Sequence, residues 1–147
     1  MSKKSFESPD ERRTPDKTEM QVVDLGSVKA ARMTLQPGWR WSECIEPVVG
    51  TESCQTHHVG TVAAGQLHVR HNDGTEVELS PGDAYVIEPG HDAWVIGSDP
   101  FVGCEFDSKA AVTYARAANR QAAHPEVALI LGQDRSGDPL GQLAQAE

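Results

Sequence analysis

The stretch Pro-Gly-Asp-Ala-Tyr-Val-Ile-Glu-Pro-Gly-His-Asp-Ala-Trp occupies residues 81–94 and decides the fold class. Its two Pro-Gly pairs bracket the apolar run 84–87 and open a second run at 93–96. Proline presets the φ angle that a tight turn needs, and glycine accepts positive φ, so each pair predicts a turn between short strands. The stretch therefore predicts turn, strand, turn and strand in a β-rich domain.

The same rhythm runs through the chain on both sides of this stretch. Short apolar runs between turn-forming residues recur at 27–35, 57–63, 67–70, 77–79 and 101–106. The segment 39–45 also alternates, which puts Trp39 and Trp41 on one face of a predicted strand and Arg40 on the other. Roughly nine or ten strands, spaced about 8–12 residues apart, predict an all-β sandwich or barrel.

The stretch 81–94 resembles the second sequence motif of the cupin superfamily, in which Pro-Gly-Asp, a strand and a second Pro-Gly precede a histidine. The resemblance extends from Thr51 to Trp94, because the turn at Gly65 matches the glycine that ends the first motif of that family. It implies a double-stranded β-helix, or jelly-roll barrel, with a metal bound inside. It also implies a homodimer, and uncovered sheet edges give a physical reason for such pairing.

Length and composition predict one domain with a tail at each end. A chain of 147 residues with 38% hydrophobic content is long enough to bury one core. Residues 1–18 are polar and charged, and predict a flexible arm or one that lies on a partner subunit. Residues 19–107 hold the predicted barrel. Residues 108–147 form a predicted C-terminal extension, partly disordered, with a short irregular or helical segment.

The formal net charge of −9 argues against polyanionic partners. Residues 21–107 carry thirteen acidic and four basic side chains, whereas the two tails are balanced. Such a surface repels phosphates and anionic lipid, so we expect no nucleic-acid and no membrane partner. The three cysteines, the lack of a secretory signal and the lack of an apolar run of ~20 residues predict a cytoplasmic protein with reduced thiols.

The resemblance to cupins implies metal ligands in the first motif, and this sequence departs from the usual pattern there. Counting back from Gly65 puts His58 at the glutamate position of the family. Glu52 and Cys54 then fall at its two histidine positions, and a longer spacing shifts both positions one residue earlier. The candidate cofactor is one transition metal ion, namely zinc, iron, manganese or copper.

In the second motif, the metal-binding histidine of the family falls on Ala93, which has no ligating atom. His91 lies two residues earlier, in the predicted turn, and we expect it to serve as a ligand only if that turn is rearranged. A site with one clear histidine, His58, is typical of a vacated metal site whose polar groups line a ligand pocket. His91 and Asp92 form a candidate imidazole–carboxylate pair, although Asp92 more ordinarily caps the turn.

Aromatic residues make up only 5% of the chain, so its three tryptophans stand out. In a small barrel, such side chains either line a pocket for a small organic ligand or fill the core. The predicted ligand-binding residues are Trp39, Trp41, His58, Tyr85, His91 and Trp94.

Three functions are consistent with these residues. The first is a small-molecule-binding protein with a vacated or non-standard metal site and an accessory or sensing role in small-molecule metabolism. The alternative is a metal-dependent enzyme, of the dioxygenase, isomerase or decarboxylase type, that uses His58 with Cys54, Glu52 or His91. The third is a structural module whose barrel is filled by side chains. The lack of a ligand at Ala93 places the first function ahead.

Overall fold

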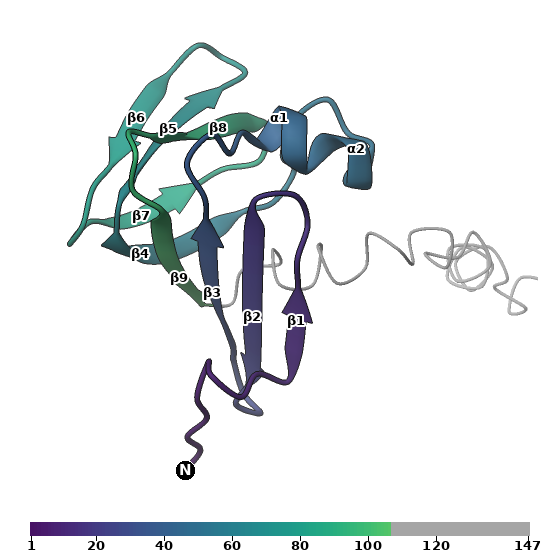
Figure 1. Cartoon of the computed structure of the whole chain (residues 1–147), viewed down its shortest axis with the longest axis vertical. Coiled ribbons are helices and arrows are strands. Elements are labelled where there is room, and N and C mark those ends of the chain that lie inside the picture. Colours follow the sequence, from purple (N-terminus) through teal and green to yellow (C-terminus); the bar gives the residue numbers. More distant parts are fainter. Residues whose placement is uncertain (107–147) are drawn as a thin grey trace, which may run out of the picture. The chain divides into compact units, whose positions relative to one another are not determined.

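The computed structural model describes residues 1–106, and in this part of the chain nine antiparallel strands and two short helices are present (Figure 1). The strands are β1 (Glu11–Arg13), β2 (Thr18–Asp24), β3 (Lys29–Leu35), β4 (His58–Ala64), β5 (Gln66–His71), β6 (Glu76–Leu79), β7 (Ala84–Ile87), β8 (His91–Ile96) and β9 (Phe101–Phe106). The helices α1 (Trp41–Cys44) and α2 (Glu46–Val49) lie between β3 and β4. Neither of them is long and apolar enough to cross a membrane.

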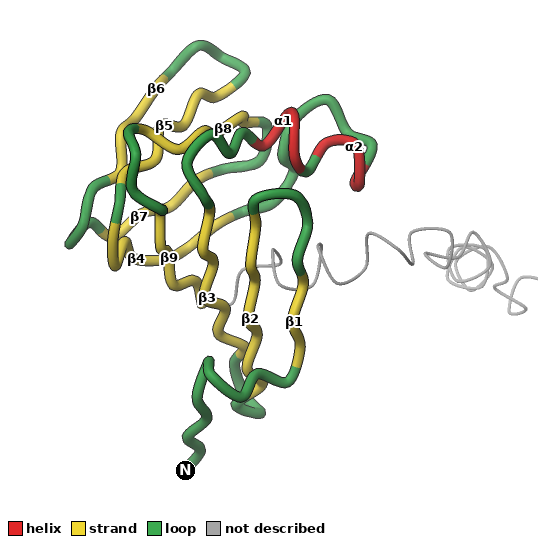
Figure 2. The backbone as a smooth tube through the Cα atoms, in the orientation of Figure 1, coloured by secondary structure: helices red, strands yellow, loops and turns green. Residues whose placement is uncertain are grey.

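The strands form two sheets, in agreement with the all-β prediction. The larger sheet has the order β1-β2-β3-β9-β4-β7 and the smaller sheet has the order β6-β5-β8 (Figure 2). From β4 onward the chain passes repeatedly between the sheets: β5 and β6 lie in the smaller one, β7 in the larger, β8 in the smaller and β9 in the larger. This winding is that of a jelly roll, and it brings the strand starts of β4 and β8 into the same interior.

The core lies between the two sheets and follows the two-residue period of β structure. The main cluster of buried apolar residues includes Val62 and Phe101 from the larger sheet and Leu67 and Val95 from the smaller one. Along β8, buried and half-buried residues alternate without interruption. Successive side chains of a strand point to opposite faces, so this alternation decides which residues of the 81–94 stretch reach the interior.

The prediction of a strand at 39–45 is wrong, because helix α1 begins at Trp41. Arg40 makes an isolated antiparallel bridge with Trp94. The carbonyl oxygen of Trp39 accepts a hydrogen bond from the backbone N–H of Val95, with an N···O distance of 3.0 Å. These contacts end the extended segment after one bridge and start a helical turn. The alternation of apolar residues within 39–45 could not predict these contacts, because Trp94 and Val95 lie far along the chain.

The segment 1–18, predicted as an arm, contains strand β1. This strand pairs antiparallel with β2, and the carboxylate of Asp10 accepts a hydrogen bond from the backbone N–H of Asp24 at 2.7 Å. The sequence Glu-Arg-Arg has little β propensity, so no strand was predicted there. Strand β1 pairs with backbone N–H and C=O groups that would otherwise be unpaired at the edge of β2. The predicted extension at 108–147 lies outside the described residues.

Phe101 and Phe106 provide a matched test of the core, because both lie on β9 but their exposed fractions are 0% and 47%. We expect Phe101→Ala to lower the free energy of unfolding by about 3–5 kcal/mol, since it leaves a cavity in the core. Phe106→Ala, the control, should change it by about 0.5 kcal/mol or less. Urea unfolding measures both, and equal effects would contradict the inward orientation of Phe101.

Candidate metal centre

Three side chains with ligating atoms meet inside the fold. Cys54, His58 and His91 are all buried, and their ligating atoms lie within 4.8 Å of one another. We refer to these three residues as the Cys-His-His group. His58 opens β4 in the larger sheet, His91 opens β8 in the smaller sheet, and Cys54 lies in the segment that leads into β4. The group therefore depends on how the two sheets pack together.

Backbone pairing places Cys54 beside His91. The backbone N–H of Cys54 donates to the carbonyl oxygen of His91 at 2.8 Å, and the N–H of Gly90 donates to the carbonyl oxygen of Cys54 at 2.7 Å. Four residues after Cys54, the alternation of β4 turns His58 inward. The neighbouring residue, His57, is exposed, as expected for a side chain that points to the opposite face.

His91 faces the interior without any rearrangement of the Pro-Gly turn. It is the first residue of β8, and the buried residues of this strand alternate, so His91 and Ala93 lie on the same inner face. The expectation that His91 needs a rearranged turn is therefore wrong. Moving two residues along a strand returns to the same face. Although Ala93 offers no ligating atom, the imidazole of His91 therefore lies one step earlier on that face.

Hydrogen bonds at Nδ1 orient both imidazoles. Nδ1 of His91 lies 2.7 Å from the carbonyl oxygen of Glu88, which can only accept, so Nδ1 carries a proton and Nε2 is the nitrogen left for a metal ion. Nδ1 of His58 lies 2.8 Å from the carboxylate of Glu105, and its Nε2 lies 3.5 Å from Sγ of Cys54. An imidazole held at Nδ1 by a carboxylate or a carbonyl is the usual form of a histidine metal ligand.

Glu105 is a residue of this site that the sequence analysis missed. Its exposed fraction is 1%, and its carboxylate accepts hydrogen bonds from His58 and, at 3.1 Å, from the hydroxyl of Tyr85. The available signal was the alternation of β9, in which Phe101, Gly103 and Glu105 share the inner face. An acidic residue on the same face of a strand as a buried phenylalanine is a candidate for a buried carboxylate with hydrogen-bond partners.

Two glycines leave the space that this carboxylate and its tyrosine partner occupy. A Cβ atom at Gly60 would lie 2.9 Å from the Tyr85 hydroxyl and 3.0 Å from Cγ of Glu105. A Cβ atom at Gly103 would lie 3.0 Å from the same hydroxyl. The Cβ atom at Gly60 would also overlap the backbone carbonyl oxygen of Cys104. A larger residue at these positions would therefore crowd strand β9 as well as Tyr85 and Glu105.

The buried groups shift the pKa values of one another. Burial by itself would lower the pKa of His58, but the Glu105 carboxylate and the hydrogen bond to Cys54 raise it to about 10. Burial by itself would raise the pKa of Cys54, but hydrogen bonds from His58 and His91 lower it to about 6. Burial and the charge of Glu105 raise the pKa of Tyr85. Both shifts favour a thiolate on Cys54 beside an imidazolium on His58 in the metal-free group.

A cavity of about 30 Å³ adjoins the Cys-His-His group. Five of the six predicted ligand-binding residues are among those that line it, namely Trp39, Trp41, His58, Tyr85 and His91. This volume holds about two water molecules. It is small beside the roughly 300–1,000 Å³ of pockets that enclose drug-sized molecules. The side chains as packed here favour an ion with a very small ligand over a larger organic molecule.

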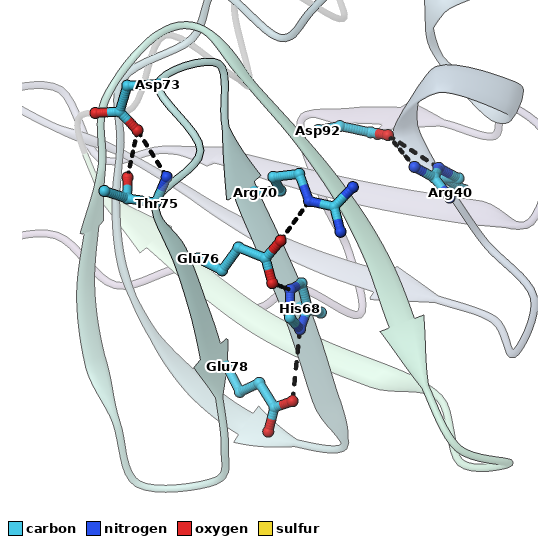
Figure 3. Close-up of polar contacts among 8 residues, drawn as sticks. All are labelled: Arg40, His68, Arg70, Asp73, Thr75, Glu76, Glu78 and Asp92. Carbon is cyan, nitrogen blue, oxygen red and sulfur yellow. Dashed lines mark hydrogen bonds and ion pairs between the residues drawn. The ribbon is translucent and has the colours of Figure 1, made fainter.

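Trp94, the sixth predicted ligand-binding residue, lies on the other face of β8. Strand alternation turns Ala93 inward and Trp94 outward. The indole stacks on the ring of His68 with centroids 4.4 Å apart, and the guanidinium of Arg40 lies 4.6 Å from its centroid. Figure 3 shows Arg40 and His68 with their carboxylate partners, Asp92 and Glu76. Trp94 thus belongs to an outer polar cluster and does not line the cavity.

Asp92 pairs with Arg40 rather than with His91. Its carboxylate lies 2.8 Å from Nη2 of Arg40 and accepts a hydrogen bond from the backbone N–H of Ser42 at 3.1 Å. The second contact satisfies one of the free N–H groups in the first turn of α1. The candidate imidazole–carboxylate pair of His91 and Asp92, the less expected of the two alternatives, does not form, because neighbouring residues of a strand point to opposite faces.

Glu52 and the other two cysteines lie apart from the Cys-His-His group. Glu52, predicted as a ligand, is exposed at the surface. Cys44, Cys54 and Cys104 are free thiols, so the three cysteines form no disulfide. Burial raises the pKa values of Cys44 and Cys104, which leaves Cys54 as the thiol that ionises most readily.

No family model matches the sequence, and no curated protein sequence matches it. Solved structures do resemble the chain. A protein of unknown function from Rhizobium leguminosarum bv. viciae is 20% identical, with a TM-score of 0.53, over 72% of this chain and 94% of that protein. A sugar phosphate isomerase from a cupin superfamily, from Silicibacter pomeroyi, is 17% identical, with a TM-score of 0.51, over 71% of this chain and 73% of the isomerase. The chain has a cupin fold.

The cupin fold predicted from residues 81–94 is thus confirmed. An oxalate decarboxylase from Lactobacillus farciminis is 18% identical over 65% of this chain, with a TM-score of 0.48, and this chain spans only 30% of that enzyme. At these identities the likeness covers the cupin fold and leaves the chemistry to the residues of this site, since one fold supports many activities.

The metal-free protein provides a direct test of the buried thiolate. We expect an ultraviolet thiolate signal that appears with a midpoint near pH 6, because the two imidazoles lower the pKa of Cys54 to about 6. The signal should be absent below neutral pH in Cys54→Ser, since the pKa values of Cys44 and Cys104 are raised. Thiolate absorbance that rises only in the ordinary range of a free cysteine, near pH 8.5, would contradict the geometry.

Proposed function

We propose that the protein binds one transition metal ion through Cys54, His58 and His91, and that a small molecule binds at the remaining coordination position. The observation that carries this proposal is the convergence of one thiolate and two oriented imidazoles in a buried site. Three protein ligands and one open position are typical of zinc centres that act on a bound molecule, whereas structural zinc sites have four protein ligands.

The spacing of the Cys54 and His58 ligating atoms fits a tetrahedral ion. Zinc lies about 2.3 Å from a thiolate and about 2.0–2.1 Å from an imidazole nitrogen, which places the sulfur and nitrogen atoms about 3.6 Å apart. Sγ of Cys54 and Nε2 of His58 are 3.5 Å apart. Metal binding would therefore replace the proton that these two atoms share, with little movement of either side chain.

The ligating atoms, one sulfur and two nitrogens, also indicate which metals the site prefers. Thiolate and imidazole ligands suit zinc, copper and iron, while manganese prefers carboxylate and water oxygens. The carboxylate of Glu105 is occupied by His58 and Tyr85, so it orients a ligand rather than binding the ion itself. Zinc is our first choice because one thiolate with two imidazoles satisfies its tetrahedral preference. Of the four metals predicted from the sequence, manganese fits least well.

The cavity next to the group supports a role in recognising or sensing a small molecule. It adjoins His58 and His91 and is otherwise lined largely by apolar side chains such as Leu35, Leu67 and Ile87. A molecule bound there would be shielded from bulk water, and this strengthens its interaction with the metal. Such a site responds to a ligand of a few atoms, in keeping with the accessory or sensing role expected from the sequence.

A metal-dependent enzyme is the second candidate, and the open coordination position favours it. A metal ion lowers the pKa of water bound at such a position, which makes that water a nucleophile near neutral pH. Relaxation of bulk-water protons by the copper-loaded protein would reveal whether an exchangeable water occupies the position. Relaxation no greater than that of a closed four-ligand copper protein would remove this candidate.

Metal analysis tests the proposed site. We expect about one zinc ion per chain after reconstitution of the chelator-treated protein, and loss of that ion in each of Cys54→Ser, His58→Ala and His91→Ala, because each removes one of three ligands. Glu52→Ala is the control, since Glu52 is exposed, and it should keep the metal. If the wild-type protein takes up no zinc, copper or iron, the proposed function is wrong.

Glu105 provides a separate prediction about orientation. Glu105→Gln should weaken zinc affinity about 10- to 100-fold, because the neutral amide holds the His58 imidazole less firmly and lowers its basicity. Tyr85→Phe is the matched control: it removes one hydrogen bond to the carboxylate but keeps the contact with His58. Zinc titration against a chromophoric chelator measures both, and comparison with the melting temperature of each metal-free variant separates metal binding from stability. A larger loss of affinity in Tyr85→Phe would contradict the role of Glu105.

A further inference from the structure

Trp39 and Trp41 line the same cavity, but their indole N–H groups have different surroundings. The N–H of Trp39 donates to the hydroxyl oxygen of Thr18 at 2.8 Å. The N–H of Trp41 is buried and has no hydrogen-bond partner, and it is the one buried side-chain polar atom in residues 1–106 with this property. A buried indole N–H usually finds a partner, and an unpaired one destabilises the fold.

The position of Trp41 does not depend on its indole N–H. Trp41 is the first residue of α1, and its carbonyl oxygen accepts the backbone N–H of Ile45 at 2.9 Å. The contact between Asp92 and the N–H of Ser42 holds the same turn from β8. The exposed fraction of Trp41 is only 3%. The indole is thus held in place by backbone contacts and packing, with its one donor unused.

We propose that the N–H of Trp41 donates a hydrogen bond to the molecule bound at the open metal position of the Cys-His-His group. This inference rests on the proposed metal site and specifies what that site binds. One end of the molecule must supply a lone pair to the metal, and another atom must accept from Trp41. A cavity of about 30 Å³ limits the molecule to a few heavy atoms.

These constraints define a chemical class: a small molecule or anion with an acceptor atom at both ends, of the carboxylate or azide type. Apart from the imidazoles, most of the lining is apolar, as at Met33, Leu35 and Ile87. Its other polar side chains already have hydrogen-bond partners, namely Thr18, Tyr85 and Glu105. Further polar groups of a larger ligand would therefore stay unpaired. Trp39 cannot take over the role of Trp41 because its N–H already has an acceptor.

Azide binding to the cobalt-substituted protein tests the inference. We expect azide to change the visible absorbance of the bound cobalt, and Trp41→Phe to raise the dissociation constant of azide about 5- to 10-fold, the usual effect of losing one hydrogen bond. Trp39→Phe is the matched control, and it should change the constant by no more than about 2-fold because its N–H faces Thr18. Cobalt content should be the same in all three proteins.

The indole N–H resonances provide a second measurement that needs no variant. In the zinc-loaded protein, azide should shift the N–H signal of Trp41 strongly and that of Trp39 weakly. Cobalt retention with equal azide affinity in wild type and Trp41→Phe would overturn the inference while leaving the metal site in place, and so would an unshifted Trp41 signal at saturating azide. Failure of the wild-type protein to retain cobalt or zinc would overturn the proposed function, and the inference with it.

Discussion

The buried carboxylate of Glu105 is the constraint on which the rest of this site depends. An ionised carboxylate inside a protein is costly unless it is paired and hydrogen-bonded. Glu105 meets both conditions through His58 and Tyr85. The space for these partners exists because positions 60 and 103 carry no side chain. The residues of β4, β7 and β9 that surround the carboxylate are therefore interdependent.

From this contact the arrangement of the candidate metal ligands follows. Glu105 holds the proton of His58 at Nδ1 and turns Nε2 toward Cys54, while the carbonyl oxygen of Glu88 does the same for His91. The backbone bridge between Cys54 and His91 closes the group. The three ligands come from two sheets and one connecting segment, so the packing of the jelly roll assembles the site and no single element contains it.

Ala93 offers no ligating atom, but the interior of the fold still contains imidazoles near this position. His91 lies on the same inner face of β8, two residues earlier, and points to the same interior. A cupin fold can thus lose its usual ligand at one position of a strand and still present an imidazole, provided that the shift is an even number of residues. The small cavity beside the group supports a metal with a small ligand over the larger organic molecule expected from the tryptophans.

Local patterns in the sequence were sufficient for the β class, the Pro-Gly turns of residues 81–94 and the inward orientation of His58. Turn chemistry and strand alternation depend on neighbouring residues, so they can be recognised without knowledge of the fold. Local patterns were insufficient where the contact that decides the structure is made with a residue far along the chain. Helix α1 begins where Ser42 meets Asp92, 50 residues away, and the carboxylate that orients His58 lies 47 residues from it. The pairing of β4 with β9 and the packing of α1 against β8 create those contacts, so only the tertiary structure could place Glu105, His91 and Trp41 around one cavity.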